Sequence, residues 1–192
     1  MSKELVLVLG GARSGKSAFA QRLAAAHDRV LFAATAEARD EDMARRIAHH
    51  KKSRPPSWDT LEEPLHLADP LGAAAQDYDA VLVDCLTLWV SNLMLREPAP
   101  VDPEADAVAQ TERLLDAYEC GRATWVVVSN EVGLGVVPPT ESGRAFRDVL
   151  GRVNQLVARR ADKVYMMVAG LALELKALGA SPLDLPGGDS LR

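Results

Sequence analysis

The eight residues Gly10-Gly11-Ala12-Arg13-Ser14-Gly15-Lys16-Ser17 constrain the fold of this chain more than any other segment. A glycine, four further residues and Gly-Lys-Ser form the pattern of a phosphate-binding loop, or P-loop, which joins a buried strand to a helix. Residues 5–9 form a short apolar run directly before the loop, and a helical pattern begins at Ser17. Motif and surroundings agree, which a chance glycine turn does not explain.

Short apolar runs alternate with helical patterns along the chain. Runs typical of strands buried on both faces of a parallel sheet occupy residues 5–9, 30–34, 80–83, 124–129 and 163–168. Apolar residues three or four apart indicate helices over residues 17–27, 41–51, 105–118 and 143–161. The alternation predicts an α/β P-loop NTPase fold with a mostly parallel sheet and helices on both faces. We expect one catalytic domain over residues 1–192, ligands at the carboxyl ends of the strands, and an irregular tail from residue 181.

Composition argues against several classes of function. The net charge of −5 and the isoelectric point near 5.4 leave no basic field for a polyanion, so nucleic acid is not an expected partner. The chain shows neither a signal-peptide pattern nor an apolar run near the roughly 20 residues of a membrane-spanning helix, which favours a cytoplasmic protein. Cys85 and Cys120 do not match zinc-ligand spacing and are interpreted as ordinary buried or partly buried thiols.

The P-loop sequence has a direct chemical interpretation. Its glycines let backbone amides turn inward around phosphate oxygens, and the start of the following helix adds partial positive charge. Lys16 is expected to reach the β- and γ-phosphates of ATP or GTP. Ser17 is expected to bind Mg²⁺, a hard cation that also takes oxygens from the nucleotide, from water and from a nearby carboxylate.

Asp84 is the candidate for that carboxylate. It ends the apolar run at residues 80–83 and therefore falls at the carboxyl end of a strand, beside the P-loop. Alternatively, Asp84 caps the helix that begins near Leu86, a common use of Asp at such a junction. The two roles are compatible.

A basic cluster interrupts the otherwise acidic chain. Its members fall within ten residues and are Arg45, Arg46, His49, His50, Lys51, Lys52 and Arg54. A charged helix end is commonly a solvated face that complements the helix dipole. The histidine pair suggests a second interpretation, because a neutral imidazole can attack phosphorus and form a covalent intermediate. Sequence spacing alone leaves His49 and His50 as alternatives.

Several further segments make the pattern more specific. They are Ala34-Thr35-Ala36, Asp42-Met43-Ala44-Arg45-Arg46-Ile47, His50 with Arg54-Pro55 and Trp58, Asp84-Cys85-Leu86-Thr87-Leu88-Trp89, Ser129-Asn130-Glu131-Val132-Gly133 and Gly151-Arg152-Val153-Asn154-Gln155. With the P-loop, they resemble the bifunctional adenosylcobinamide kinase/adenosylcobinamide-phosphate guanylyltransferase family of cobalamin biosynthesis over nearly the whole chain. The resemblance implies that ATP or GTP phosphorylates the aminopropanol hydroxyl of adenosylcobinamide. GMP from GTP is then transferred to that phosphate, giving adenosylcobinamide-GDP and pyrophosphate, with one site for both reactions.

The resemblance also implies roles for individual residues and a homotrimer. A GMP-histidine intermediate forms in the family on the histidine four residues before an Arg-Pro pair, which corresponds to His50; with Lys16 it is the implied catalytic residue. Ser17 and Asp84 are the implied metal ligands. The implied nucleotide contacts are Gly10, Gly11, Ala12, Arg13, Ser14, Gly15, Lys16, Ser17, Ala34, Thr35, Ala36, Lys51, Lys52, Ser53, Arg54, Glu62 and Asp84. The family pattern does not identify residues that bind the corrinoid.

Two other functions are alternatives on sequence grounds. A small-metabolite kinase uses the same loop without a covalent histidine, so a test for guanylylation separates the two. A GTP-controlled switch protein that binds partners predicts an Asn-Lys-x-Asp segment that reads guanine. The corresponding strand end here is Ser129-Asn130-Glu131-Val132, which argues against the switch.

Overall fold

A computed structural model describes residues 2–38 and 40–182. Within one helix, residues 41–53, it describes the backbone throughout but not the side chains of Asp42, Arg46, His49, His50, Lys52 and Ser53. The tail predicted to be irregular lies mostly outside the described residues.

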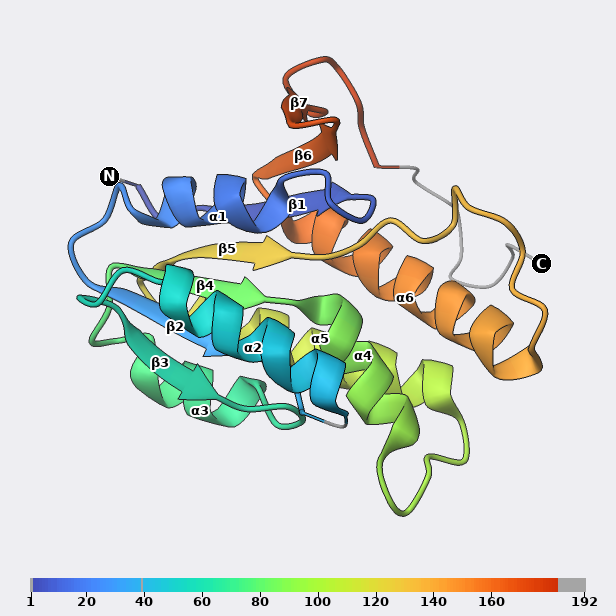
Figure 1. Cartoon of the computed structure of the whole chain (residues 1–192). Helices are drawn as coiled ribbons and strands as arrows, with labels where there is room; N and C mark the ends of the chain where they lie inside the picture. The colour runs from blue at the N-terminus through green and yellow to red at the C-terminus, as the bar shows by residue number, and fades with distance from the viewer. Residues whose placement is uncertain (1, 39, 183–192) are drawn as a thin grey trace.

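A seven-stranded sheet runs through the molecule in the order β3-β2-β4-β5-β1-β6-β7 (Figure 1). The strands are β1 (Leu5–Gly10), β2 (Val30–Ala34), β3 (Asp59–Glu62), β4 (Ala80–Asp84), β5 (Thr124–Val128), β6 (Lys163–Val168) and β7 (Leu171–Glu174). Neighbouring strands are parallel except β6 and β7. The predicted mostly parallel α/β sheet is confirmed. The prediction missed β3 and β7, because both are short and largely exposed edge strands and so lack a continuous apolar run.

Six helices connect the strands of the described chain. They are α1 (Lys16–Ala24), α2 (Glu41–Ser53), α3 (Ala68–Ala74), α4 (Leu86–Leu95), α5 (Pro103–Cys120) and α6 (Glu141–Arg160). Asp102 caps α5 by accepting from the Ala105 N–H at 3.0 Å, and Thr140 caps α6 by accepting from the Gly143 N–H at 3.1 Å. Both helices begin two residues earlier than predicted, because their capped first turns are polar and fall outside the apolar period.

The sheet buries a core on each face. Along β1, Leu5, Leu7 and Leu9 face the larger core, which α3, α4, α5 and α6 cover, whereas Val6 and Val8 face the smaller core under α1. In Figure 1, α2 lies on the same side of the sheet as α1. α4 is mostly apolar, and its residues Leu86, Trp89, Val90 and Leu93 are buried in the larger core. The Trp89 indole N–H donates to the Leu65 carbonyl at 2.9 Å.

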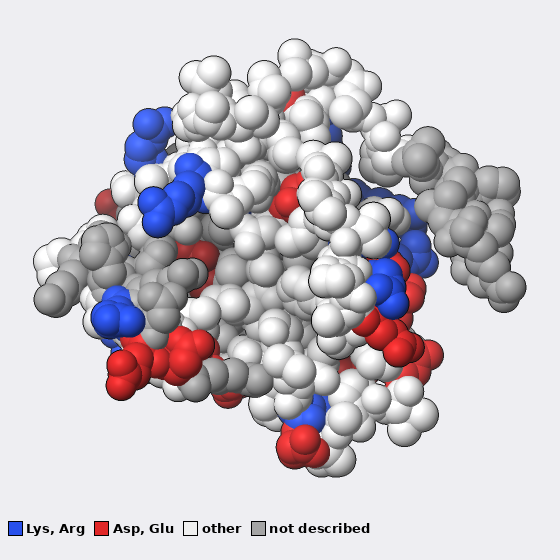
Figure 2. Space-filling model, turned by 45° about the vertical axis from the view of Figure 1, so that its right-hand side comes forward, with Lys and Arg blue, Asp and Glu red and all other residues white. Residues whose placement is uncertain are grey.

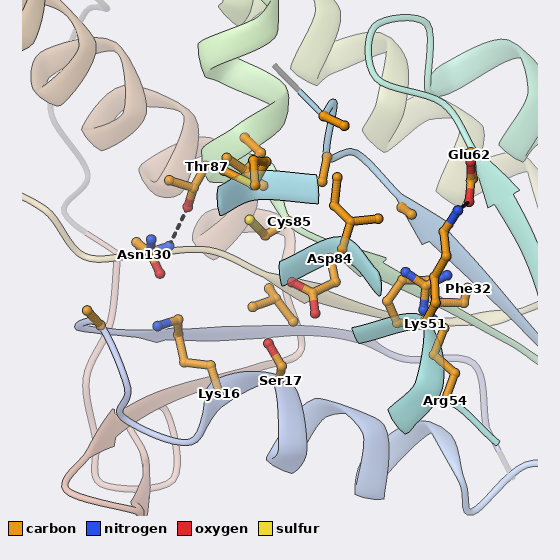
Figure 3. Close-up of a pocket in the computed structure, with 18 of the residues that line it drawn as sticks. Lys16, Ser17, Phe32, Lys51, Arg54, Glu62, Asp84, Cys85, Thr87 and Asn130 are labelled. Carbon is orange, nitrogen blue, oxygen red and sulfur yellow. Dashed lines mark hydrogen bonds and ion pairs between the residues drawn. The ribbon is translucent and has the colours of Figure 1, made fainter. Parts of the chain in front are cut away.

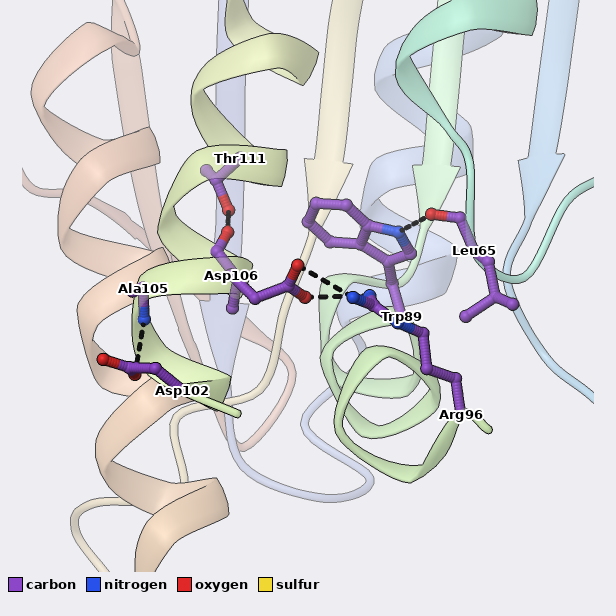
Figure 4. A network of polar contacts seen from close by, with 8 residues as sticks. Leu65, Trp89, Arg96, Asp102, Ala105, Asp106 and Thr111 are labelled. Atoms are coloured by element: carbon purple, nitrogen blue, oxygen red, sulfur yellow. Dashed lines mark hydrogen bonds and ion pairs between the residues drawn. The ribbon is translucent and has the colours of Figure 1, made fainter. Parts of the chain in front are cut away.

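A pair of charged side chains joins α4 to α5 at the edge of this core (Figure 4). Both terminal guanidinium nitrogens of Arg96 lie 2.8 Å from the two carboxylate oxygens of Asp106. The hydrogen bonds to Asp106 raise the pKa of Arg96. This bidentate contact fixes the end of α4 against the start of α5.

The register of the parallel strands aligns four residues at the carboxyl edge of the sheet. Glu62 of β3 is opposite Ala34 of β2, Ala34 is opposite Asp84 of β4, and Asp84 is opposite Val128 of β5. Residues opposite one another in a parallel sheet share a face, and Ala34 and Val128 face the α1 side. Glu62 and Asp84 are therefore carried to that same side.

None of the described helices is both long and apolar enough to cross a membrane.

Candidate nucleotide-binding site

The P-loop connects β1 to α1 through backbone conformations that glycine favours. Gly15 has φ 94° immediately before α1, and Gly10 has φ 148° with its α-carbon so close to β6 that a Cβ would lie 2.5 Å from the Met167 carbonyl oxygen. The Glu131 N–H donates to the Gly10 carbonyl at 3.1 Å, and the Gly170 N–H donates to the Ser14 carbonyl at 3.1 Å. The loop is thus held at both ends by neighbouring turns.

Lys16 lies inside the curve of this loop. Its side chain is largely buried, and Nζ donates to the Gly11 carbonyl at 2.6 Å. Burial lowers the pKa of Lys16, while the nearby Cys85 and Asp84 oppose that shift. The loop therefore holds a cation where a polyphosphate would sit, with partial positive charge from the start of α1 beside it.

A cavity of about 480 Å³ opens next to the loop at the carboxyl edge of the sheet. Figure 2, turned so that the right-hand side of Figure 1 comes forward, shows this side of the molecule hollowed, with acidic and basic side chains interspersed around the hollow. Ten of the predicted nucleotide-binding residues line the cavity. They are Ala12, Arg13, Lys16, Ser17, Ala34, Ala36, Lys51, Arg54, Glu62 and Asp84.

One end of the cavity is basic and aromatic (Figure 3). The Arg54 guanidinium carbon lies 3.9 Å from the centre of the Phe32 ring, and Lys51 forms an ion pair with Glu62. Burial lowers the pKa of Arg54, with Glu62 and Asp84 opposing the shift. The Arg54 Nε is buried and has no hydrogen-bond partner in the described part of the protein, so a donor is available at this end.

Helix α2 forms one wall of the cavity. Met43, Ile47 and Lys51 line it at intervals of four residues, and Arg54 follows three residues later. Four residues of the predicted site also belong to α2, but their side chains lie outside the described residues. They are the predicted nucleophile His50, its alternative His49, and the predicted contacts Lys52 and Ser53.

Asp84 and Ser17 meet in the middle of the cavity. Figure 3 shows the Ser17 hydroxyl and the Asp84 carboxylate turned toward one another. The residue preceding α4 is Cys85, with no side-chain capping bond, so Asp84 is not the N-cap residue of α4 but the residue before it. No cluster of three or more His, Cys, Asp or Glu side chains suited to a metal occurs among the described residues. Two oxygen donors facing one space fit Mg²⁺, which keeps several waters and uses few protein ligands.

Five predicted contacts lie beside the cavity without lining it, namely Gly10, Gly11, Ser14, Gly15 and Thr35. Thr35 is fully buried, and its hydroxyl accepts from the Cys85 N–H and donates to the Cys85 carbonyl, both at 2.8 Å. Its side chain therefore holds the chain just after Asp84. The Cys85 thiol does line the cavity, and burial raises its pKa to about 11.

The sequence prediction missed nine residues that line the cavity. They are Phe32, Ala38, Met43, Ile47, Cys85, Thr87, Leu88, Val128 and Asn130. Most are apolar or come from α2 and α4, so no chemical signal singled them out. Asn130 is different, because it follows the apolar run of β5 just as Asp84 ends that of β4.

Comparisons with known proteins point to a single family. The family described as cobinamide kinase / cobinamide phosphate guanyltransferase matches residues 6–175. The chain is 48% identical over 172 residues to the bifunctional adenosylcobalamin biosynthesis protein CobP of Pseudomonas aeruginosa, covering 88% of this chain and 96% of that protein. It is 42% and 38% identical to the bifunctional CobU proteins of Salmonella typhimurium and Escherichia coli, in each case over 90% of this chain and 99% of the relative. The chain belongs to the cobinamide kinase / cobinamide phosphate guanyltransferase family.

Proposed function

We propose that this one cavity carries out two consecutive transfers. ATP or GTP phosphorylates adenosylcobinamide, and GMP from GTP is then transferred to adenosylcobinamide phosphate through a GMP-His50 intermediate. The observation that carries the proposal is the convergence of the P-loop, Asp84 and the lining face of α2 on a single cavity. Family membership supports the pair of activities.

In the kinase step, the P-loop end of the cavity holds the nucleotide phosphates. Lys16 leaves the Gly11 carbonyl, or shares its ammonium with it, to contact the β- and γ-phosphates. The amides of the loop hold the γ-phosphoryl group in line with the acceptor hydroxyl. Positioning and charge stabilisation supply most of the catalysis in such transfers.

In the guanylyl step, a histidine of α2 attacks the α-phosphorus of GTP. The lining positions 43, 47 and 51 of α2 share one helix face, and position 50, three residues after 47, lies nearer to that face than position 49, which favours His50. The imidazole nitrogen forms a bond to phosphorus, and pyrophosphate leaves with the bonding electrons. The phosphate of adenosylcobinamide phosphate then displaces the imidazole and takes the GMP group.

Ser17 and Asp84 are the proposed protein ligands of Mg²⁺, which neutralises phosphate charge when it is bound with the nucleotide. Lys51, Lys52, Ser53 and Arg54 are the proposed nucleotide contacts at the other end, together with Ala34, Ala36 and Glu62. The buried Arg54 Nε, which has no hydrogen-bond partner among the residues that the structure describes, supports a contact there.

We also propose that the protein is a homotrimer, as the resemblance implies. The turn and edge strand at β6–β7 expose apolar side chains that a subunit contact would cover. Val168 is 51% exposed, Leu171 71%, Leu173 48% and Leu178 71%.

A product assay with Lys16→Ala tests the two-step proposal. Wild-type protein with GTP and adenosylcobinamide is expected to give first the phosphate and then the GDP derivative, resolved by mass spectrometry. Because one P-loop serves both steps, Lys16→Ala should lower both rates by at least about 100-fold while the circular dichroism spectrum is unchanged. A near-normal rate of either step in Lys16→Ala contradicts the single site. Wild-type protein that forms adenosylcobinamide phosphate but not the GDP derivative is a simple kinase.

A further inference from the structure

Asn130 follows β5 and lines the cavity at its P-loop end. In the sheet, β5 lies between β4, which ends at Asp84, and β1, which leads into the P-loop. Val126 and Val128 face the α1 side, and side chains alternate along a strand, so Asn130 points to that side as well. Figure 3 shows Asn130 at the same end of the cavity as Lys16.

The backbone around Asn130 is held on every side. Its N–H donates to Thr87 Oγ1 at 2.8 Å, and its carbonyl accepts from Asn154 Nδ2 at 3.0 Å. The preceding N–H, of Ser129, donates to the Val8 carbonyl at 3.0 Å, and the following one, of Glu131, donates to the Gly10 carbonyl at 3.1 Å. The side-chain amide of Asn130 has no hydrogen-bond partner among the described residues.

A rigidly held amide that faces the lysine of a P-loop and has no partner in the described part of the protein is suited to bind a phosphate oxygen. We propose that Asn130 contacts substrate directly, its side-chain N–H donating to an oxygen of the γ-phosphoryl group. This inference rests on the proposed function and adds a catalytic residue to its kinase step. A carboxamide does not gain or lose a proton near neutral pH, so Asn130 binds and orients and does not act as a base.

The two reactions should depend on Asn130 to different extents. In the kinase step, the acceptor hydroxyl oxygen forms a bond to the γ-phosphorus, and the bond from that phosphorus to the β–γ bridging oxygen breaks. The nucleoside diphosphate leaves with the bonding electrons, and the hydroxyl proton passes to solvent. Attack of His50 on the α-phosphorus leaves the γ-phosphoryl group within the departing pyrophosphate, so that step needs this contact less.

Binding measurements test the contact without relying on turnover. Isothermal titration with the α,β-methylene analogues of GTP and GDP, which cannot guanylylate His50, measures the preference for the γ-phosphate. Asn130→Ala is expected to reduce that preference about tenfold, because one hydrogen bond to a charged group is lost. Asn130→Asp, of the same shape, should reduce it at least as much, since its carboxylate repels phosphate. Gln110→Ala, which removes an amide from α5 away from the cavity, should leave the preference unchanged.

Kinetics test the difference between the two steps. Asn130→Ala should lower kcat for phosphorylation about 100-fold, while covalent labelling by saturating GTP stays within about threefold of wild type. An unchanged triphosphate preference overturns the inference, as does an equal loss of phosphorylation and labelling, which indicates a structural role. If Asn130→Ala shows the tenfold binding effect but wild-type protein does not phosphorylate adenosylcobinamide, the Asn130 contact stands and the proposed function is overturned instead.

Discussion

Thr35 shows at the residue scale how the site depends on side chains that do not touch substrate. Its hydroxyl pairs with both backbone groups of Cys85, and Asn92 Nδ2 donates to the Thr35 carbonyl at 2.8 Å. The strand end that carries Asp84 is therefore fixed from the neighbouring strand. The family resemblance gave Thr35 as a nucleotide contact, but which way its hydroxyl points depends on the turn after β4, which has no sequence signal.

Thr35→Val should destabilise the protein by about 1–3 kcal/mol, because it leaves the Cys85 N–H and carbonyl unpaired in a buried turn. Urea unfolding gives the difference, and the apparent affinity for Mg²⁺ during turnover should weaken as Asp84 loses its support. Thr35→Ser keeps the hydroxyl and serves as the matched control. Equal stability of Thr35→Val and wild type would show that the two hydrogen bonds contribute nothing.

The two cysteines should differ in reactivity toward iodoacetamide. The thiolate is the reactive form, and burial raises the pKa of Cys85 from 9.0 to about 11, so at pH 8 its thiolate is scarce. Cys120 is exposed at the end of α5, contrary to the expectation of a partly buried thiol. Peptide mass spectrometry should find Cys120 alkylated at least about tenfold faster at pH 8.

The rate at Cys85 should rise about tenfold per pH unit between pH 8 and pH 10, since this range lies below its pKa. A plateau within that range contradicts the raised pKa.

At the scale of elements, helices could be predicted where one face is buried, and strands could be predicted where most of the strand is buried. The five central strands carry mostly apolar runs, and the structure has all five; both faces are covered along β1, β2, β4 and β5, whereas β6 is partly exposed. The edge strands β3 and β7 form mainly because a neighbouring strand offers a free edge, which no local pattern encodes. Helix α3 is only seven residues long and was missed. Only the start of α4 near Leu86 was predicted, because α4 is too uniformly apolar to show a helical period.

The contact between α4 and α5 is expected to be stronger than an ordinary surface ion pair. A double-mutant cycle with Arg96→Met and Asp106→Asn should give a coupling energy of about 1 kcal/mol, because the two bonds are parallel and both side chains are partly buried. Arg113 and Asp69, which link α5 to α3 in solvent, form the comparison pair, with an expected coupling below about 0.5 kcal/mol. Unfolding in urea measures both, and equal couplings would contradict a special role for the first pair.

For the whole molecule, the site could be predicted where it depends on topology. Asp84 was found because the carboxyl ends of parallel strands meet at one edge, and the same reasoning applied to β5 leads to Asn130. The apolar wall from Phe32, Met43 and Ile47 was not predictable, because apolar side chains at a ligand and in a core look alike in sequence.

The proposed trimer gives a prediction at the same scale. If the β6–β7 region forms a subunit contact, Leu171→Asp should dissociate the assembly, because it places a charge on a covered apolar surface. Light scattering after size-exclusion chromatography measures the mass. Asp substituted for Leu134, which is 80% exposed in the loop after β5, serves as the control and should leave the mass unchanged. A monomeric wild type contradicts the proposal directly.

Covalent labelling by GTP is the most direct test of the account. Wild-type protein incubated with GTP labelled at the α-phosphate should retain label after denaturation, and the label should be acid-labile, as expected of a phosphoramidate. Label at the γ-phosphate should not be retained. Label should disappear in His50→Ala and persist in His49→Ala, which changes the same basic helix end. Label that persists in His50→Ala, or a fully active wild type that never carries label, would contradict a GMP-His50 intermediate.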